Sequence, residues 1–406
     1  MIEDTKDFNG FRLLVTPYQN KKLPVYRWYH FNHSFSRDLV WYLIDKFELN
    51  SQSSILDPFC GSGTTLLAAK QRGISAIGMD ILPLSVFISN AKLQNYDTKK
   101  IEHKAKELDE LLNNNANYKP SIPKIPILHK VFDEKTLFNI FAIRNWIRGI
   151  KDEKLRYFFL TALLSAVEKM AYAKKDGGFL RLTPDKEIAD IKDAIFTKVN
   201  EMLMDIGDGN IQNNVDSNAF LGDARKFYFP EESFDAIITS PPYLNRHDYT
   251  RVYILELAIG FLESENELKE LRHKTLRSHV EAKRIFNDGN YIEPPTLKDI
   301  LDRLKEKTLP NKQVIPMIGG YFEDMYLVLK EVARVTKRGG FAAFVIGDVR
   351  YGGILIPVNE ILAEIGDSLG LVHQETIVAR FRGNSPQQMG KFGRMPAKEN
   401  IVVWRK

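Results

Sequence analysis

A glycine-rich turn between two short apolar runs constrains the fold of this chain more than any other feature. The run Ser54–Asp57 ends in an acid and leads into Pro58-Phe59-Cys60-Gly61-Ser62-Gly63. The segment Thr64–Gln71 has the pattern of a helix stopped by Gly73, and residues 74–80 form a second apolar run that ends in an acid. Strand, glycine-rich turn, helix and strand make a βαβ unit, so we expect a parallel sheet.

Apolar runs further along the chain predict more strands of the same sheet. The seven predicted strands begin at Ser54, Ala76, Ala219, Phe234, Phe341, Leu371 and Asn400. A glycine-rich and basic loop, residues 382–398, joins the last two, where a parallel pair would need a longer crossover. We therefore expect an α/β fold with a seven-stranded sheet whose last strand is antiparallel.

Two stretches interrupt this alternation of strands and helices. Residues 96–215 are mostly helical in character, with apolar residues at three- and four-residue steps, and predict an inserted helical subdomain. Residues 263–318 are polar and somewhat basic, which makes them a candidate region for DNA recognition. The remaining parts, residues 1–95, 216–262 and 319–406, are expected to form one α/β domain.

Composition excludes several classes of protein. The 406 residues are 44% hydrophobic, enough for one large domain with additions, and contain no apolar run long enough to span a bilayer. The start of the chain lacks the order of a secretory signal, and the single cysteine, Cys60, fits a reducing cytoplasm. One cysteine also excludes a cysteine-based zinc site, and we expect no metal. The net charge of +5 is compatible with nucleic acid binding without establishing it.

The glycine-rich turn has the spacing of a cofactor site. Its glycines let the backbone approach a ligand closely, and Asp80, about 20 residues on, can accept hydrogen bonds from ribose hydroxyls. The turn lacks the Gly-Lys-Ser/Thr sequence that cradles phosphate, and Asp57 before it would repel a phosphate but tolerate a cationic cofactor. The pattern favours an adenosine-bearing cofactor over a bare strand-to-helix turn.

A second acidic turn, Gly222-Asp223-Ala224, follows the third predicted strand. The Asp223 carboxylate can accept a hydrogen bond from an adenine amino group. Taken alone, a Gly-Asp pair indicates only a turn.

The run Thr239-Ser240-Pro241-Pro242-Tyr243 lies at the carboxyl end of a buried strand, where ligands bind in open α/β sheets. The two prolines remove two amide donors and leave carbonyls and the Ser240 hydroxyl as acceptors. Tyr243 offers a flat face for a base. Hydrogen-bond acceptors at both hydrogens of an exocyclic amine favour its attack on a methyl group, because they stabilise the positive charge that develops on the nitrogen as the methyl group arrives. A rigid strand-to-loop exit is the non-functional alternative.

Together the glycine-rich turn and the Ser-Pro-Pro-Tyr run resemble the DNA amino-methyltransferases, which make N4-methylcytosine or N6-methyladenine. The resemblance covers residues 25–95 and 216–406 and implies a Rossmann-like sheet that binds S-adenosyl-L-methionine. It implies that Ser240, Pro241, Pro242 and Tyr243 are catalytic and hold a flipped base. It also implies cofactor contacts from Ser36, which would cap a helix facing the methionine carboxylate, and from Asp57, Pro58, Phe59, Gly61, Gly63, Thr64, Asp80, Asp223 and Ser240.

Ser240 favours cytosine N4 as the target, because the adenine enzymes of this family mostly have Asp or Asn at that position. N6-adenine methylation and methylation of an RNA (tRNA) amino group remain alternatives, as does a cofactor-binding but idle subunit. Methylation at cytosine C5 would need a cysteine nucleophile, whereas Cys60 lies inside the cofactor turn.

Double-stranded DNA is the expected partner, and the resemblance leaves open a restriction endonuclease and the oligomeric state. Basic residues near the acceptor run are candidates for phosphate contacts. They are Arg246, His247, Arg251, Arg272, Lys274, Arg277, Lys283, Arg284, Arg380, Arg382, Lys391 and Arg394. A further basic turn, residues 174–181, lies within the helical insertion.

Overall fold

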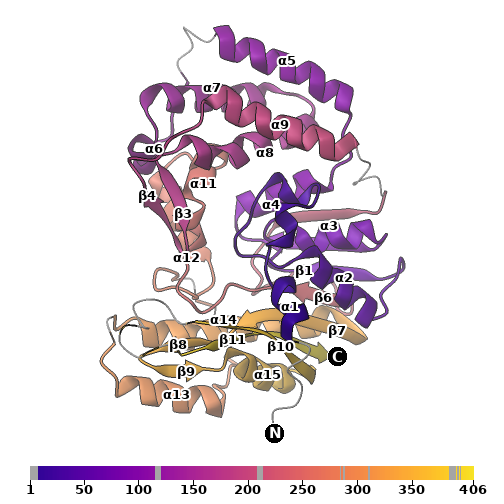
Figure 1. The fold of residues 1–406 in the computed structure, drawn as a ribbon. Coiled ribbons are helices and arrows are strands. Elements are labelled where there is room, and N and C mark those ends of the chain that lie inside the picture. The colour runs from indigo at the N-terminus through magenta and orange to yellow at the C-terminus, as the bar shows by residue number, and fades with distance from the viewer. Residues whose placement is uncertain are drawn as a thin grey trace.

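The central sheet has seven strands in the order β10-β11-β7-β6-β1-β2-β5 (Figure 1). The computed structural model describes residues 8–114, 120–207, 214–283, 285–286, 289–309, 311–383, 390, 393 and 395–406. The sheet strands are β1 (Ser54–Asp57), β2 (Ser75–Asp80), β5 (Ser217–Leu221), β6 (Phe234–Thr239), β7 (Thr336–Gly347), β10 (Val372–Arg382) and β11 (Ala397–Arg405). Strand β11 is antiparallel to both β7 and β10, and the other pairs are parallel. The α/β class and the antiparallel last strand are confirmed.

Strand β7 begins at Thr336, whereas the sequence pattern placed its start at Phe341. The additional residues pair with the end of the chain. Gly339, at φ +80°, donates its amide to the carbonyl of Lys406, and the Lys406 amide donates to Gly340. Glycine allows this left-handed backbone, so the Gly339-Gly340 pair is part of the strand.

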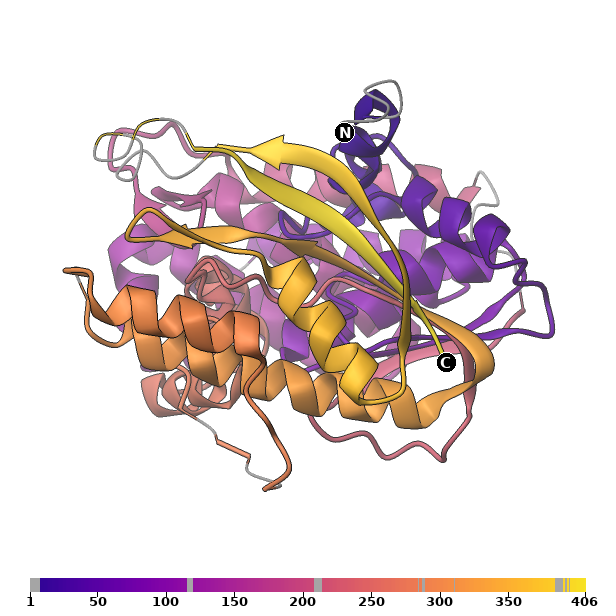
Figure 2. The same cartoon turned by 90° about the horizontal axis from the view of Figure 1, so that it is seen from below.

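Apolar residues of β1 point alternately to two cores, so the sheet is buried on both faces. Ile55 packs in one cluster with α2 (Arg37–Lys46), α3 (Thr64–Gln71) and α4 (Pro83–Leu93). Leu56 packs in the other with α14 (Val314–Val335) and α15 (Val358–Ser368). Figure 2 shows the second of these layers from below, with the strands β10 and β11 crossing it. Parallel strands require such cover, because neither of their faces is polar.

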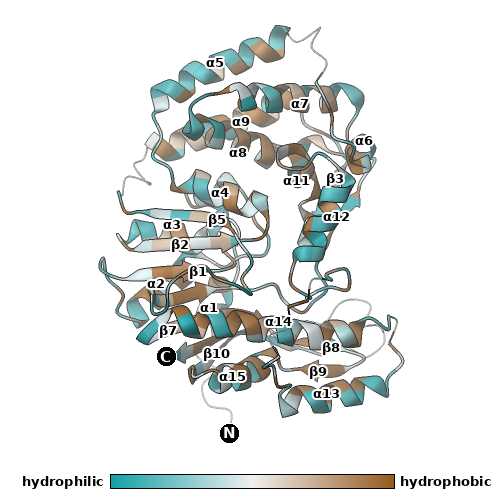
Figure 3. Cartoon of the chain, turned by 180° about the vertical axis from the view of Figure 1, so that it is seen from behind, coloured by the Kyte–Doolittle hydropathy of each residue, from teal (hydrophilic) through white to brown (hydrophobic). Residues whose placement is uncertain are grey.

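The predicted helical insertion lies between β2 and β5. It contains α5 (Thr98–Asn114), α6 (Pro126–Val131), α7 (Glu134–Gly149), α8 (Glu153–Met170) and α9 (Ile191–Gly207). Figure 3 shows the contrast between a largely hydrophilic α5 on the outside and a more hydrophobic α8 beneath it. The insertion also holds a hairpin, β3 (Ala173–Asp176) and β4 (Phe179–Leu182), that the sequence analysis described only as a turn.

Among the described residues of the polar stretch 263–318, two helices lie wholly inside it, and α14 begins near its end. The two inside it are α12 (Glu265–Lys274) and α13 (Pro295–Lys305). The other elements are α1 (Phe8–Leu14), the 3-10 helices η1 (Gln19–Lys21) and η2 (Tyr26–Trp28), α10 (Tyr249–Val252), α11 (Ile254–Gly260), and a hairpin of β8 (Val349–Tyr351) and β9 (Ile354–Ile356). In Figure 1, α12 and β3–β4 descend beside one another from the helical insertion towards the lower part of the molecule.

Candidate active site

Two adjoining pockets open where the carboxyl ends of β1, β2 and β6 meet. The first, which we call the Asp80 pocket, has a volume of about 720 Å³ and is lined by Pro58, Phe59, Gly61, Asp80 and Asp223, among others. The second, the Tyr243 pocket, has a volume of about 560 Å³ and is lined by Ser240, Pro241 and Tyr243, among others. Strand order reverses between β1 and β6, which is where open α/β sheets bind ligands.

The two glycines of the turn have different tasks. Gly61 (φ +51°) lies on the wall of the Asp80 pocket, and a Cβ there would approach the Phe31 ring to 3.4 Å. Gly63 (φ +79°) packs against α4, where a Cβ would lie 3.0 Å from the Cα of Ser89. Gly61 therefore brings backbone to the pocket, whereas Gly63 allows α3 to pack against α4.

The carboxylate of Asp80 organises the turn from the end of β2. It accepts hydrogen bonds from the amides of Gly61 (3.0 Å) and Leu82 (2.9 Å). Burial raises the pKa of Asp80 to about 6, against the opposing effect of these hydrogen bonds. Asp80 also lines the pocket, so its carboxylate can accept from a ligand there.

Asp57 lies behind the pocket wall. Its Oδ1 accepts hydrogen bonds from the Thr239 hydroxyl (2.6 Å) and the Phe59 amide (3.1 Å), and the residue is 2% exposed. Burial raises the pKa of Asp57 to about 6. This carboxylate ties the glycine-rich turn to β6, directly before Ser240.

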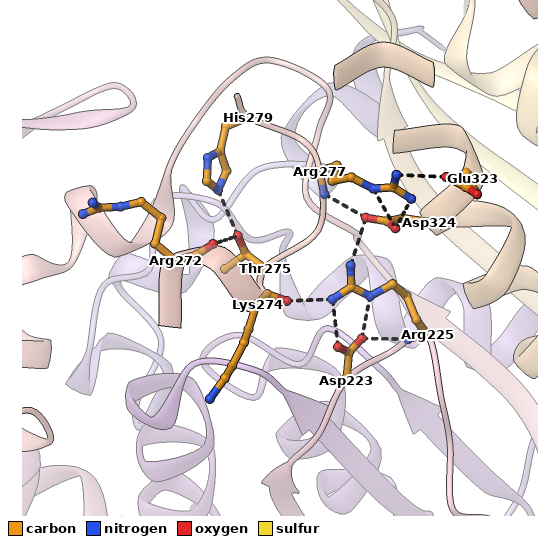
Figure 4. Close-up of polar contacts among 9 residues, drawn as sticks. All are labelled: Asp223, Arg225, Arg272, Lys274, Thr275, Arg277, His279, Glu323 and Asp324. Carbon is orange, nitrogen blue, oxygen red and sulfur yellow. Dashed lines mark hydrogen bonds and ion pairs between the residues drawn. The ribbon is translucent and has the colours of Figure 1, made fainter. Parts of the chain in front are cut away.

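Asp223 enters the Asp80 pocket as part of a chain of ion pairs (Figure 4). The guanidinium of Arg225 donates to both carboxylate oxygens of Asp223, at 2.9 and 2.8 Å. It also donates to Asp324 on α14 (3.1 Å) and to the carbonyl of Lys274 (2.7 Å). The side chains of Arg225 and Asp324 are fully buried, so this chain fixes the position of Asp223.

A wall of the Asp80 pocket comes from residues 274–279, directly after α12. Its lining residues are Lys274, Thr275, Leu276, Ser278 and His279. Asp324 holds this segment through the amide and the guanidinium of Arg277, at 2.9 and 2.6 Å (Figure 4). The sequence analysis missed this wall, because basic composition was the only signal in the segment and it pointed to DNA.

Ser240 lies on both pockets. Its hydroxyl donates to the carbonyl of Val345 on β7 at 3.0 Å, which commits its proton and leaves its lone pairs as acceptors. The carbonyl of Pro242 accepts from the hydroxyl of Tyr321 at 3.0 Å, which fixes the backbone of the run.

His33 and Tyr249 are the other residues common to both pockets. Their rings meet edge to face at 4.9 Å, and Tyr253 stacks on Phe31 at 4.5 Å behind them. Burial, with help from the charges of His247 and Lys175, lowers the pKa of His33 to about 3. His33 is therefore neutral at pH 7. Phe31 and His33 lie in the stretch 27–43, which resembles the family's segment before the cofactor turn, but no pattern in the sequence indicated a role in the site for any of these aromatic residues.

Two other predicted cofactor residues lie outside the lining of the Asp80 pocket. Ser36 is the N-cap of α2 and accepts from the amide of Leu39 at 3.3 Å, as predicted. Thr64 begins α3, and its hydroxyl lies 3.1 Å from that of Ser34, a lining residue of the Tyr243 pocket.

Many of the predicted DNA-binding residues form ion pairs within the chain. Arg272 pairs with Asp248 at 2.7 Å, Arg251 with Glu281 at 2.7 Å, and Arg277 with Glu323 at 2.9 Å. In the helical insertion, Lys175 pairs with Glu256 and Arg181 with Asp176. Arg246 is exposed, and Lys274 lines the Asp80 pocket. Arg284, Lys391 and Arg394 lie outside the described residues.

Comparisons with known proteins place this architecture in a family. A family model described as DNA methylase matches residues 13–91. The chain is 31% identical to the Type II methyltransferase M.BsoBI of Geobacillus stearothermophilus, over 100% of this chain and 90% of the relative. It is 32% identical to the Type II methyltransferase M.AvaI of Nostoc sp., over 97% and 89%. It is 25% identical to the Type II methyltransferase M.MvaI of Kocuria varians, over 79% and 75%.

The chain therefore belongs to the DNA amino-methyltransferases. More particularly, the relatives that it matches over nearly their whole length are Type II methyltransferases. Across the described residues, every helix is too short or too polar to cross a membrane.

The cofactor of the family is S-adenosylmethionine, and the Asp80 pocket fits it. The carboxylates of Asp80 and Asp223 suit ribose hydroxyls and an adenine amine. Phe31, Phe59 and Tyr249 provide apolar walls, as expected for a pocket that takes a heterocycle. The neutral His33 adds no positive charge where the two pockets meet.

Proposed function

We propose that this protein methylates the N4 amino group of cytosine in duplex DNA with S-adenosylmethionine. The serine that opens Ser240-Pro241-Pro242-Tyr243 supports cytosine over adenine. We further infer that the chain is the modification enzyme of a restriction-modification or phage-defence system, with a restriction endonuclease as its functional partner.

One observation carries this proposal: Ser240 lies where the two pockets join, and its proton is already committed to Val345. A hydroxyl whose proton is engaged in this way can take part in a further hydrogen bond only as the acceptor. An exocyclic amine delivers its lone pair to an electrophile best when acceptors engage its hydrogens. The oxygen at the junction of the pockets has this property.

The cofactor contacts follow from the Asp80 pocket. S-adenosylmethionine supplies an electrophilic methyl group when it is bound. Asp80 accepts the ribose hydroxyls, and Asp223, held by Arg225, accepts the adenine amine. Pro58, Phe59 and Gly61 form the wall beside them. Asp57, Gly63, Thr64 and Ser36 act from behind, because they set the turn, α3 and the start of α2.

The target base occupies the Tyr243 pocket. It must leave the duplex, because its amine is otherwise paired and out of reach of the cofactor. The side chains of Ser240, Pro241 and Tyr243 line this pocket, and Pro242 lines the other side of the run. Transfer is direct and needs no cysteine nucleophile. Cys60 is 4% exposed, and burial raises its pKa, which keeps it a thiol.

The test is to incubate the protein with methyl-labelled cofactor and unmodified bacterial DNA, then digest the DNA to nucleosides and separate them. We expect the label in N4-methylcytosine. Label only in N6-methyladenine would overturn the cytosine assignment. Label in tRNA and none in DNA, in a parallel reaction, would make the protein an RNA amino-methyltransferase.

A further inference from the structure

Two neighbouring strands, β10 and β11, bring two arginines and a glutamate to the Tyr243 pocket. Arg380 and Arg382 alternate on β10, so their side chains lie on one face, and Glu399 lies opposite Arg380 on β11. Glu399 is 3% exposed and forms an ion pair with Arg380. The Nη1 of Arg382 is 3.8 Å from the same carboxylate. None of these residues belongs to the acceptor run.

Arg382 lies against Tyr243. Its guanidinium carbon is 5.1 Å from the centre of the Tyr243 ring. Gly347 on β7 leaves the space for this contact, because a Cβ there would come within 2.2 Å of Arg382 Nη2 and 3.2 Å of Tyr243 Cδ2. The backbone of β7 is therefore adapted to a guanidinium beside this ring.

The Nε of Arg382 is buried and has no hydrogen-bond partner among the residues that the structure describes. A buried donor without an acceptor is unfavourable, and an acceptor in the pocket would remove that penalty. Arg380 differs in this respect, since its Nε is engaged by Glu399. Of the two arginines, Arg382 is the one whose Nε has no acceptor among the described residues.

The two candidate bases differ in what they present to such a donor. Next to its amine, cytosine carries N3 and then O2, which are both acceptors. Adenine carries N1 next to its amine and then a carbon-bound hydrogen. With the amine at Ser240, a donor at the far end of this edge is paired by cytosine and left unpaired by adenine. Sites that pair a substrate group in this way reject analogues that lack it.

We propose that Arg382 determines the target base, by donating to the O2 and N3 edge of a cytosine bound in the Tyr243 pocket. The inference rests on the proposed function, since it assumes that the flipped base occupies this pocket. It adds a selective contact that is independent of Ser240 and comes from a different part of the sheet.

The experiment compares two duplexes that differ only at the target base, cytosine or adenine, in a recognition sequence located beforehand by sequencing methylated DNA. The kcat/KM for methyl transfer is measured on both with the wild type, R382Q, R382K, G347A and R380Q. G347A displaces the guanidinium of Arg382 and leaves its charge in place. R380Q is the matched control, because it removes the other arginine on Glu399. Binding of S-adenosylhomocysteine to each variant reports that it is folded.

We expect R382Q and G347A to lower the cytosine-to-adenine ratio of kcat/KM by about 10- to 100-fold, mainly through loss on cytosine. R382K, which keeps a charge but has lost the planar fork, should give a smaller change, and R380Q should lower both rates alike. An unchanged ratio in R382Q would overturn the inference, as would an equal rise of KM on both duplexes, which would indicate a phosphate contact. If the G347A variant does not bind S-adenosylhomocysteine, it is not folded, and the R382Q variant alone then tests the inference. Failure of the proposed function is a separate result, since it appears as N6-methyladenine from the wild type.

Discussion

The two pockets differ in charge, and the difference indicates what each one holds. The Asp80 pocket carries two carboxylates, Asp80 and Asp223, and two cations, Arg225 and Lys274, so its charges balance. Arg225 is paired with Asp223, and Asp80 is the carboxylate that remains for a cation. The Tyr243 pocket carries two arginines and one carboxylate. A cationic cofactor suits the first, and a base edge rich in acceptors suits the second. Neutral groups, His33, Ser240 and Tyr249, occupy the boundary.

Removing the Ser240 hydroxyl should have the largest effect and should leave cofactor binding intact. Without that acceptor, the amine loses a contact that matters most during transfer. We expect Ser240→Ala to lower kcat by about 100-fold. The measurement is single-turnover methylation of DNA together with the Kd for S-adenosylhomocysteine. If the Kd rises as much as kcat falls, the two pockets do not have separate tasks.

Replacing Asp80 should produce the opposite pattern. Asp80→Asn keeps the shape but removes the charge that binds ribose hydroxyls, so we expect the cofactor Kd to rise by about 10- to 100-fold, the cost of charged hydrogen bonds. At saturating cofactor, kcat should change far less. Calorimetric titration with S-adenosylmethionine measures the affinity. A Kd equal to that of the wild type would remove Asp80 from the site.

Cofactor affinity should also fall with pH. The pKa of Asp80 is about 6 in the ligand-free protein, so its charge is present above pH 6 and is lost as the pH falls below it. At pH 5 we expect binding about tenfold weaker than at pH 7.5. Both shifts also act on stability. The lowered pKa of His33 reduces the free energy of unfolding below about pH 6.5, where the unfolded histidine gains a proton, whereas the raised pKa of Asp80 increases it as the pH falls through 6. Circular dichroism at both pH values separates the two effects, and the Asp80→Asn variant should show a flatter binding profile.

A smaller effect, on the stability of the fold, is expected from the hydrogen bond that joins the glycine-rich turn to β6. Thr239→Val removes the hydroxyl that donates to the buried Asp57, so the free energy of unfolding should fall by about 1–3 kcal/mol. Urea denaturation measures this change. A variant as stable as the wild type would show that the contact between Asp57 and Thr239 is dispensable.

Sequence reasoning predicted which residues local to each strand end the structure brings together at one edge of the sheet. Gly61 and Ser240 follow strands and Asp80 ends one, and the carboxyl ends of parallel strands meet at the same edge of a sheet. The order of strands could therefore be turned into a site before any contact was known. The N-cap role of Ser36 is likewise a local property and is confirmed.

The rest depends on contacts between distant segments. Arg225 and Asp324 are 99 residues apart in the sequence, and a hydrophobic pattern along the chain does not predict such a pair. The basic residues of the wall 274–279 were interpreted as a DNA-binding surface, although Arg277 forms ion pairs with Asp324 and Glu323. The hairpin β3–β4 was missed as strands because its residues, Ala-Lys-Lys-Asp and Phe-Leu-Arg-Leu, do not alternate between apolar and polar.

The most direct test of the whole account is a map of modified bases in the DNA of a bacterium that expresses this chain, compared with one that expresses Ser240→Ala. The account predicts N4-methylcytosine at one short sequence throughout the genome, and loss of that mark in the variant. N6-methyladenine at a defined sequence would contradict the assignment of cytosine to the Tyr243 pocket. A genome without any new modified base would contradict the account as a whole.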